Sequence, residues 1–270
     1  MTDGVRSLGV ADIRLTELGI MDAIDAFCEE RGLRYYLFYG SLLGAVRHEG
    51  FIPWDDDMDI IMPRESYQVF LEEFGTERYK VAKQGALERY PYAYAKVYDT
   101  STRLVENAHS KCVYGVFVDV FPMDDLGSDW NEIVALKERI KPKNKMLVAR
   151  SITWSKQYSF ASNLMHMCAH IISCTKSTPR RAQELDELAQ SLAQPDSRFA
   201  GNLLLGTLRA FPKEWFEPAE RLPFEGREYV TPCNRAQLLE SLYGDWRTLP
   251  PDEKRVTRHC FTAWRPGALQ

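Results

Sequence analysis

"YLFYGSLLGAVRHEGFIPWDDDMDIIMPRESYQVF", residues 36–70, is the stretch from which the fold can be inferred. The aromatic run over 33–40 ends in glycine and suits a buried strand that turns sharply. A short helix with Ser41 as its N-cap is expected to follow. Residues 57–62 then suit a second strand, which Pro63 closes because proline cannot donate to a ladder. The stretch therefore predicts strand, helix and strand, with acidic residues at the start of the second strand.

Four aspartates crowd the start of that second strand, where a core element would ordinarily be apolar. Side chains alternate on a strand, so Asp57 and Asp59 share one face while Met58 and Ile60 point to the other. Like charges about 4 Å apart repel by about 1 kcal/mol in water and about 4 kcal/mol at an effective dielectric near 20, so the arrangement costs free energy unless a cation compensates. Carboxylate oxygens favour Mg²⁺ or Mn²⁺, particularly where a phosphate supplies further ligands.

Taken alone, an Asp-x-Asp pattern fits a solvated acidic turn equally well. Two further features favour a metal site. Asp119 lies within the apolar run "VFVDVFPMDD", where an unpaired charge would be costly to bury and a shared metal would explain it. The Gly40–Ser41 turn lets the backbone approach a ligand, and the helix that it starts presents N–H groups to an anion, although many such turns look alike.

The remaining first half alternates helices and strands, which predicts an α/β or α+β fold. In chain order we expect a helix over 11–31 stopped by Gly32, a helix over 66–74, and strands over 79–84, 92–99 and 114–121, the last ending before Pro122.

From Trp130 onward the apolar spacing becomes helical. We expect helices over 130–150, 157–174 and 179–193, the last with a Ser or Thr cap and Pro179 in its first turn. We divide the chain into a catalytic core, 1–126, and a mostly helical lobe with a C-terminal motif, 127–270, packed together as one structural unit.

Composition limits the class of protein. A chain of 270 residues with 45% hydrophobic content can bury a sizeable core. A net charge of -4 gives no basic face for nucleic acid, so no nucleic-acid partner is expected. The six cysteines contain no C-x-x-C pair and fit free thiols. Without a secretory leader or an apolar run of about 20 residues, we expect a cytoplasmic protein with no transmembrane segment.

The order of strand, Gly-Ser turn and helix, then Asp57-x-Asp59, then Asp119, resembles the nucleotidyltransferase-like (polymerase β type) superfamily. There, three carboxylates hold divalent metal ions that bind nucleotide phosphates. Residues 36–70 as a whole resemble the signature of the LicD family, which includes bacterial phosphocholine transferases and is related to the fukutin-type transferases. Segments 95–103, 115–125 and 222–250 agree in the same order. The resemblance implies a nucleotidyltransferase-like core with a mixed sheet.

The resemblance also implies an activity. Members of the family move a phosphorylated alcohol from a CDP-linked donor to a sugar hydroxyl and release CMP, as transferases of substituted phosphate groups. For this chain it implies Mg²⁺- or Mn²⁺-dependent transfer, first of all of phosphocholine, to a cell-surface glycan such as lipopolysaccharide, capsule or teichoic acid. A lipid-linked acceptor would bring peripheral contact with the inner face of the membrane. The alcohol, the acceptor sugar and the oligomeric state are left undefined.

Two alternatives stay open. One is nucleotidyl transfer, in which an NTP donor releases pyrophosphate. The other is a catalytically silent protein that uses the same fold to bind a nucleotide or a glycan.

The expected site residues follow from the motif positions. Asp57, Asp59 and Asp119 are assigned as catalytic metal ligands, Asp55 as an accessory ligand and Asp56 as structural. Asp119 can also orient or deprotonate the acceptor hydroxyl. The expected substrate-binding residues are Gly40, Ser41, Arg47, His48, Trp54 and Lys96.

Each substrate-binding assignment has a plainer alternative. Arg47 and His48 could instead satisfy a helix C-terminus, and Lys96 could lie on an exposed strand face; an inward Lys96 would need an anionic partner. Trp54 and Tyr39 could hold a quaternary ammonium by cation–π attraction, although such rings are more often core. Farther along, Glu225, Gly226, Tyr243, Gly244 and Asp245 match the family pattern, and both glycines are interpreted as turn formers.

One apolar segment, "FASNLMHMCAHIISC" over 160–174, permits several interpretations. His166, His170 and Cys174 are spaced as on one helix face and could bind a transition metal, but a buried or membrane-facing surface is preferred. The segment is too short to span a bilayer, yet it could lie on one or seat a lipid-linked acceptor. Ordinary helix packing is the preferred interpretation.

Overall fold

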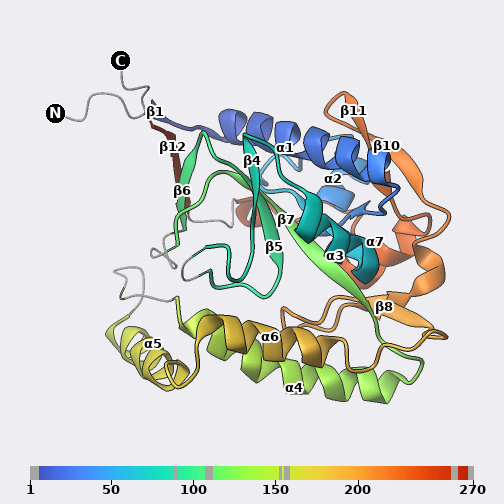
Figure 1. Cartoon of the computed structure of the whole chain (residues 1–270). Coiled ribbons are helices and arrows are strands. Elements are labelled where there is room, and N and C mark those ends of the chain that lie inside the picture. Colours follow the sequence, from blue (N-terminus) through green and yellow to red (C-terminus); the bar gives the residue numbers. More distant parts are fainter. Residues whose placement is uncertain are drawn as a thin grey trace.

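A computed structural model describes residues 6–87, 90–106, 112–151, 154, 159–256 and 261–266. Its centre is a mixed seven-stranded sheet (Figure 1) in which β3 and β7 are parallel and the other neighbours are antiparallel. The main strand order is β2 (Tyr36–Leu37), β3 (Asp59–Pro63), β7 (Phe117–Asp125), β5 (Ala95–Asp99) and β4 (Tyr79–Ala82), and β8 (Phe199–Gly201) and β9 (Ala210–Pro212) extend the far end of β7. The expected mixed α/β class is confirmed.

Helices and smaller strand pairs surround this sheet. Helices α1 (Val10–Arg31) and α3 (Arg64–Glu73) pack on it, and α2 (Tyr39–His48) packs between β3, α7 (Arg235–Tyr243) and the hairpin of β10 (Glu220–Phe224) and β11 (Arg227–Thr231). A small sheet joins β1 (Arg6–Ser7), β12 (Phe261–Arg265) and β6 (Arg103–Glu106). Short 3₁₀ turns cover Lys213–Trp215 and Asp252–Lys254.

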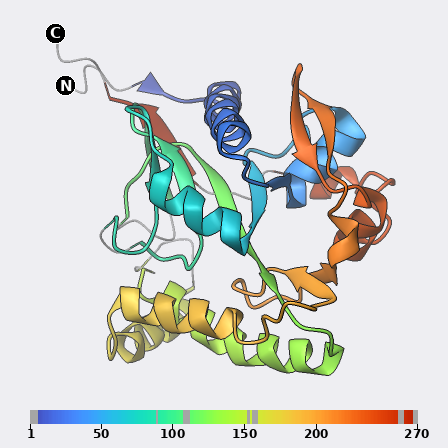
Figure 2. The ribbon, with the colours of Figure 1, turned by 45° about the vertical axis from the view of Figure 1, so that its right-hand side comes forward.

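Three helices form a separate layer below the sheet (Figure 2): α4 (Trp130–Ala149), α5 (Phe160–Ser173) and α6 (Thr178–Ala189). Arg64 joins this layer to the sheet, because its guanidinium donates to Asp124 on β7 at 2.6 and 2.9 Å and to Asp186 on α6 at 2.9 Å. None of the described helices is both long and apolar enough to span a bilayer.

The local patterns explain the first helix and the central strands. Helix α1 ends as predicted at Gly32, which takes the left-handed conformation at φ 64° that glycine adopts without strain. Strands β3 and β7 are buried on both faces, with Ile60, Ile61 and Val120 fully enclosed. Such central strands read as continuous apolar runs, so a carboxylate within one stands out.

Two predictions about the opening motif were wrong. The run over 33–40 is strand only at Tyr36–Leu37, and α2 begins already at Tyr39 with Phe38 as its N-cap. Ser41 is therefore not the cap. Its buried hydroxyl instead accepts a hydrogen bond from the Asp59 backbone N–H at 2.8 Å and so ties α2 to the start of β3.

The strand around Asp119 is also longer than predicted. Strand β7 does not stop before Pro122 but continues to Asp125, with Pro122 opposite Met62 on β3. Proline removes only a donor, and its carbonyl still accepts from Asn202 Nδ2 at 3.1 Å. Beyond α6 the chain returns to strands, and β8 pairs with the extended end of β7. The run of three consecutive helices in the second half thus ends at Ala189, and α7 follows only after four further strands.

The C-terminal hairpin fixes the loop that leads to the aspartates. At its tip, Glu225 (φ 51°) and Gly226 (φ 74°) form the turn, which confirms Gly226 as a turn former. The Glu225 carboxylate accepts from the Phe51 N–H at 3.1 Å, and a Cβ on Gly50 would lie 2.3 Å from the same carboxylate. Any larger residue at position 50 would therefore have to displace the Glu225 side chain from this contact.

Candidate active site

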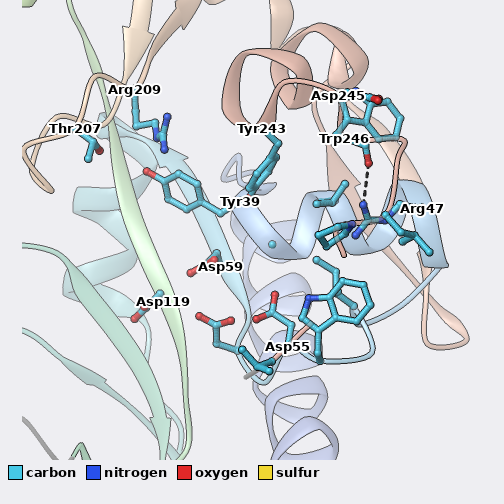
Figure 3. Close-up of a pocket in the computed structure, with 18 of the residues that line it drawn as sticks. Tyr39, Arg47, Asp55, Asp59, Asp119, Thr207, Arg209, Tyr243, Asp245 and Trp246 are labelled. Carbon is cyan, nitrogen blue, oxygen red and sulfur yellow. Dashed lines mark hydrogen bonds between the residues drawn. The ribbon is translucent and has the colours of Figure 1, made fainter. Parts of the chain in front are cut away.

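A pocket of about 820 Å³ opens between the N-terminal ends of β3 and β7, which carry Asp59 and Asp119, helix α2 and the C-terminal segments (Figure 3). Most of its polar residues come from segments far apart in the sequence. Its lining includes Tyr39, Gly40, Arg47, Trp54, Asp55, Asp57, Asp59, Tyr94, Asp119, Phe121, Thr207, Arg209, Tyr243, Asp245 and Trp246. The pocket is the candidate active site because the predicted carboxylates converge on it.

The acidic wall is set by strand register. Asp59 is the first residue of β3 and lies directly opposite Asp119 on the parallel strand β7. The Asp119 N–H donates to the Met58 carbonyl at 2.9 Å, which locks this register. Asp57 lies just before β3 rather than on it, yet it lines the same pocket. The predicted convergence of Asp57, Asp59 and Asp119 on one pocket is observed.

Asp55 joins the wall through the loop that precedes β3. Helix α1 holds this loop, because Arg14 donates to the carbonyls of Ile52, Pro53 and Asp55 at 2.5 to 3.1 Å. A Cβ on Gly40 would lie 2.6 Å from Asp55 Oδ2, so glycine lets this carboxylate reach the start of α2. A carboxylate is favoured there by the helix N-terminus.

The carboxylates destabilise one another's ionised forms. Burial raises the pKa of Asp59 well above its ordinary value, and the charges of Asp57, Asp119 and Asp55 raise it further. Burial also raises the pKa of Glu17 on α1, and the neighbouring aspartates, Asp57 first, add to the rise. Repulsion of this kind is relieved by a divalent cation. The all-oxygen donor set therefore fits Mg²⁺ or Mn²⁺.

The aspartate triplet has a division of roles. Asp55, Asp56 and Asp57 can bring one oxygen each within 4.8 Å of one another. Asp56, however, is buried and does not line the pocket. We therefore place Asp55 and Asp57 on the pocket side of the cluster and Asp56 in the protein interior.

Lys96 binds Asp119 directly. The two residues are paired on β5 and β7, and Lys96 Nζ lies 2.6 Å from Asp119 Oδ1. The lysine is 2% exposed, and its ammonium lies over the Phe117 ring at 3.5 Å and the Tyr92 ring at 4.8 Å. Lys96 does not line the pocket. Its anionic partner is thus a site carboxylate, and the exposed-strand alternative is wrong.

Arg209 lies on the other side of the pocket from the carboxylates, beside Thr207 and Tyr39 (Figure 3). Tyr39 begins α2 with φ 41°, an uncommon conformation for a residue with a side chain. Burial raises the pKa of Tyr39, Asp59 adds to the rise, and the charge of Arg209 opposes it. The Tyr39 hydroxyl is buried beside Arg209, and both side chains line the pocket.

The far end of the pocket holds Arg47 and Trp54. Arg47 donates from Nη1 to the Trp246 carbonyl at 2.8 Å and from Nε to His48 at 2.9 Å. Burial lowers the pKa of Arg47, and burial together with Arg47 lowers that of His48. The Arg255 guanidinium lies over the Trp54 ring, 5.6 Å from its centroid. Arg47 thus helps to hold the C-terminal segment as well as lining the pocket.

The predicted site residues thus divide into two groups. Gly40, Arg47 and Trp54 line the pocket with the four aspartates, whereas Ser41, His48 and Lys96 lie behind its walls. The histidines and Cys174 of the apolar segment are not near this pocket, and they form no close ligand cluster among the described residues.

Arg209, Thr207 and Glu17 were missed in the sequence analysis. Arg209 and Thr207 lie in the segment least similar to the family pattern, and no local spacing marks them. Glu17 could have been noticed as a charged residue on the apolar side of the first helix, where it is 2% exposed.

Comparison with known proteins assigns the chain to a family. Residues 32–165 match the family described as LicD/FKTN/FKRP, nucleotidyltransferase domain, and the chain belongs to this family. Among its relatives is the lipopolysaccharide cholinephosphotransferase LicD of Haemophilus influenzae, which is 27% identical over an alignment of 270 residues. The alignment covers 96% of this chain and 99% of the relative. The human ribitol 5-phosphate transferase FKRP is 42% identical over 60 residues, 22% of this chain and 11% of that protein.

Proposed function

We propose that this protein transfers a phospho-alcohol from a CDP-linked donor to a hydroxyl of a cell-surface glycan and releases CMP. Phosphocholine is the proposed cargo because the full-length relative is named a cholinephosphotransferase. One observation carries the proposal: Asp55, Asp57, Asp59 and Asp119 line one side of a pocket whose other side carries Arg209. Such a pocket suits a phosphorylated donor held between a cation and a guanidinium.

The carboxylates have the chemistry to hold Mg²⁺ or Mn²⁺. Asp57, Asp59 and Asp119 would hold it, with Asp55 as the accessory ligand, inside a core of the nucleotidyltransferase type. When bound, the cation neutralises charge on the phosphate oxygens. This role accounts for four carboxylates on one wall.

Asp119 would take up the acceptor proton. As the acceptor oxygen forms its bond to the donor phosphorus, the bond from that phosphorus to the CMP oxygen breaks, and CMP leaves with the electron pair. The hydroxyl proton passes to a carboxylate. Lys96 holds one oxygen of Asp119 at 2.6 Å, which orients the carboxylate. Lys96 is therefore a positioning residue.

Aromatic rings lie beside the acidic wall. Tyr39 and Tyr243 line the pocket, and both are close enough to Asp59 for its charge to raise their pKa after burial has done so. A quaternary ammonium is attracted both by aromatic faces and by carboxylates. Trp54 is the weaker candidate because Arg255 already lies over its ring.

The activity is tested with a panel of CDP-choline, CDP-ethanolamine, CDP-ribitol and CDP-glycerol. We expect Mg²⁺-dependent binding of one donor in preference to the others, and CMP release when an acceptor glycan is added. Release of pyrophosphate from an NTP would favour nucleotidyl transfer instead. The absence of any metal-dependent donor binding in calorimetry would favour a silent binding protein.

Arg209→Ala is expected to weaken donor binding by roughly 10- to 100-fold, because a charged hydrogen bond to phosphate contributes about 1.5–3 kcal/mol. Arg209→Lys should retain part of the affinity. The matched control is Arg198→Ala, at an exposed arginine outside the pocket. Calorimetric titration with the preferred donor measures the effect, and unchanged affinity in Arg209→Ala would remove this residue from the site.

A further inference from the structure

Helix α5 is oriented with its apolar side toward solvent. Its large apolar residues are 53 to 72% exposed: Phe160, Leu164, Met165, Ile171 and Ile172. Their spacing places them on one face of the helix. The inward face is polar, because Asn163 and Ser173 are buried and His170 Nδ1 lies 3.0 Å from the Ala149 carbonyl. The helix packs on α4 as the sequence suggested, but through its polar side, so its large apolar residues are not part of the core.

The exposed face extends beyond the helix. Trp154 is 54% exposed and packs edge-on against Phe160, with ring centroids 5.8 Å apart. Scattered apolar residues on a surface need no explanation, but a contiguous group of this kind marks an interaction site. We define Trp154, Phe160, Leu164, Met165, Ile171 and Ile172 as the α5 patch.

The charges around the patch identify its partner. Residues 130–189, which contain α4, α5 and α6, the three helices of this layer, carry ten Lys or Arg and five Asp or Glu, a net charge of +5 within a chain of total charge -4. Helix α4, on which α5 packs, exposes Lys141, Lys143 and Lys145. Part of this charge is neutralised nearby, because Glu138 pairs with Lys137, and Glu184 pairs with Lys176 and Arg180 and lies near Lys143. Segment 159–175, which contains α5, has no Asp, Glu, Lys or Arg.

We propose that the α5 patch binds the surface of an anionic lipid bilayer. An uncharged apolar helix face within a basic helical layer matches the helices that lie in the headgroup region of such membranes, and tryptophan is favoured at that depth. A second copy of the chain fits less well, because its equally basic helical layer would be repelled.

The helical layer also supports the pocket. Gly206 lies against α4, where a Cβ on Gly206 would come 3.0 Å from Lys141 Cα, and the neighbouring Leu205 and Thr207 line the pocket. A bilayer on this layer would bring the pocket near the membrane surface, where a lipid-linked acceptor is found. This last point rests on the proposed function, whereas membrane binding itself does not.

The test is flotation of the full chain with vesicles of phosphatidylcholine, with and without phosphatidylglycerol. We expect binding to the anionic vesicles, reduced at least about tenfold in Leu164→Gln/Ile171→Gln, because two apolar side chains leave the bilayer. The matched control, Leu15→Gln/Val113→Gln, changes two exposed apolar residues elsewhere and should bind normally. Lys143→Glu/Lys145→Glu should weaken anionic binding by about fivefold or more per lysine.

Several outcomes would overturn the assignment. The assignment is wrong if the natural chain does not bind vesicles. It is also wrong if the natural chain and Leu164→Gln/Ile171→Gln bind them equally. Light scattering provides a further check: a dimer that the same double variant dissociates, without vesicle binding, would assign the patch to a second copy. Equal melting temperatures of the variants show that folding is intact. None of these measurements requires catalysis, so failure here is distinct from failure of the proposed activity.

Discussion

Asp57→Asn is expected to lower turnover by about 10³-fold or more, because charge neutralisation by a bound cation is worth several kcal/mol in the transition state. The same variant should make the metal-free protein more stable. Asp57 is the leading charged neighbour that raises the pKa of both Asp59 and Glu17, so its removal relieves repulsion within the acidic wall. The gain should be about 1 kcal/mol. Opposite changes in activity and stability would mark a functional charge cluster.

Three measurements separate these effects. CMP release gives turnover, calorimetric titration with Mn²⁺ gives metal affinity, and thermal unfolding in EDTA gives stability. Asp196→Asn, at an exposed position outside the pocket, is the matched control and should change none of them. Full turnover in Asp57→Asn would sink the metal assignment. Lost turnover with normal Mn²⁺ affinity would instead make Asp57 a substrate contact.

Lys96→Met is expected to cost about 3–5 kcal/mol in the free energy of unfolding, because it leaves the Asp119 carboxylate without its buried partner. The two groups lie 2.6 Å apart, with side chains 3% and 11% exposed. The double variant Lys96→Met/Asp119→Asn should recover most of the loss, since it removes both charges. It should remain inactive, because Asp119 has lost its charge.

Urea unfolding of the four forms, in a double-mutant cycle, measures this coupling. If Lys96 contacted the donor instead, Lys96→Met would weaken donor binding and leave the unfolding free energy within about 1 kcal/mol of the natural value. A coupling energy near zero would contradict the ion pair as the main role of Lys96. The control is Arg64→Met/Asp124→Asn, which removes a buried ion pair outside the pocket. This double variant tests for general effects on the core, and it should leave donor affinity unchanged.

The sequence predicted most of the acidic wall because the signal is local. A carboxylate within an apolar run is conspicuous wherever the strand lies, and this identified Asp59 and Asp119. The boundaries were less predictable. Residues 33–40 were expected as strand, but α2 starts at Tyr39, and Ser41 accepts a hydrogen bond from Asp59 instead of capping the helix. Likewise, β7 passes Pro122 because partners on β3 and β8 continue on either side.

The sequence by itself determined that Asp57 and Asp59 lie together at the start of an apolar strand, that Asp119 needs a partner, and the family resemblance. Only the tertiary structure placed Arg209 on the opposite side of the pocket and paired Lys96 with Asp119. It also decided that the apolar face of α5 points outward. Periodicity shows which residues share a face of one element, but which face is buried, and what lies across from it, depends on contacts between elements far apart in the chain.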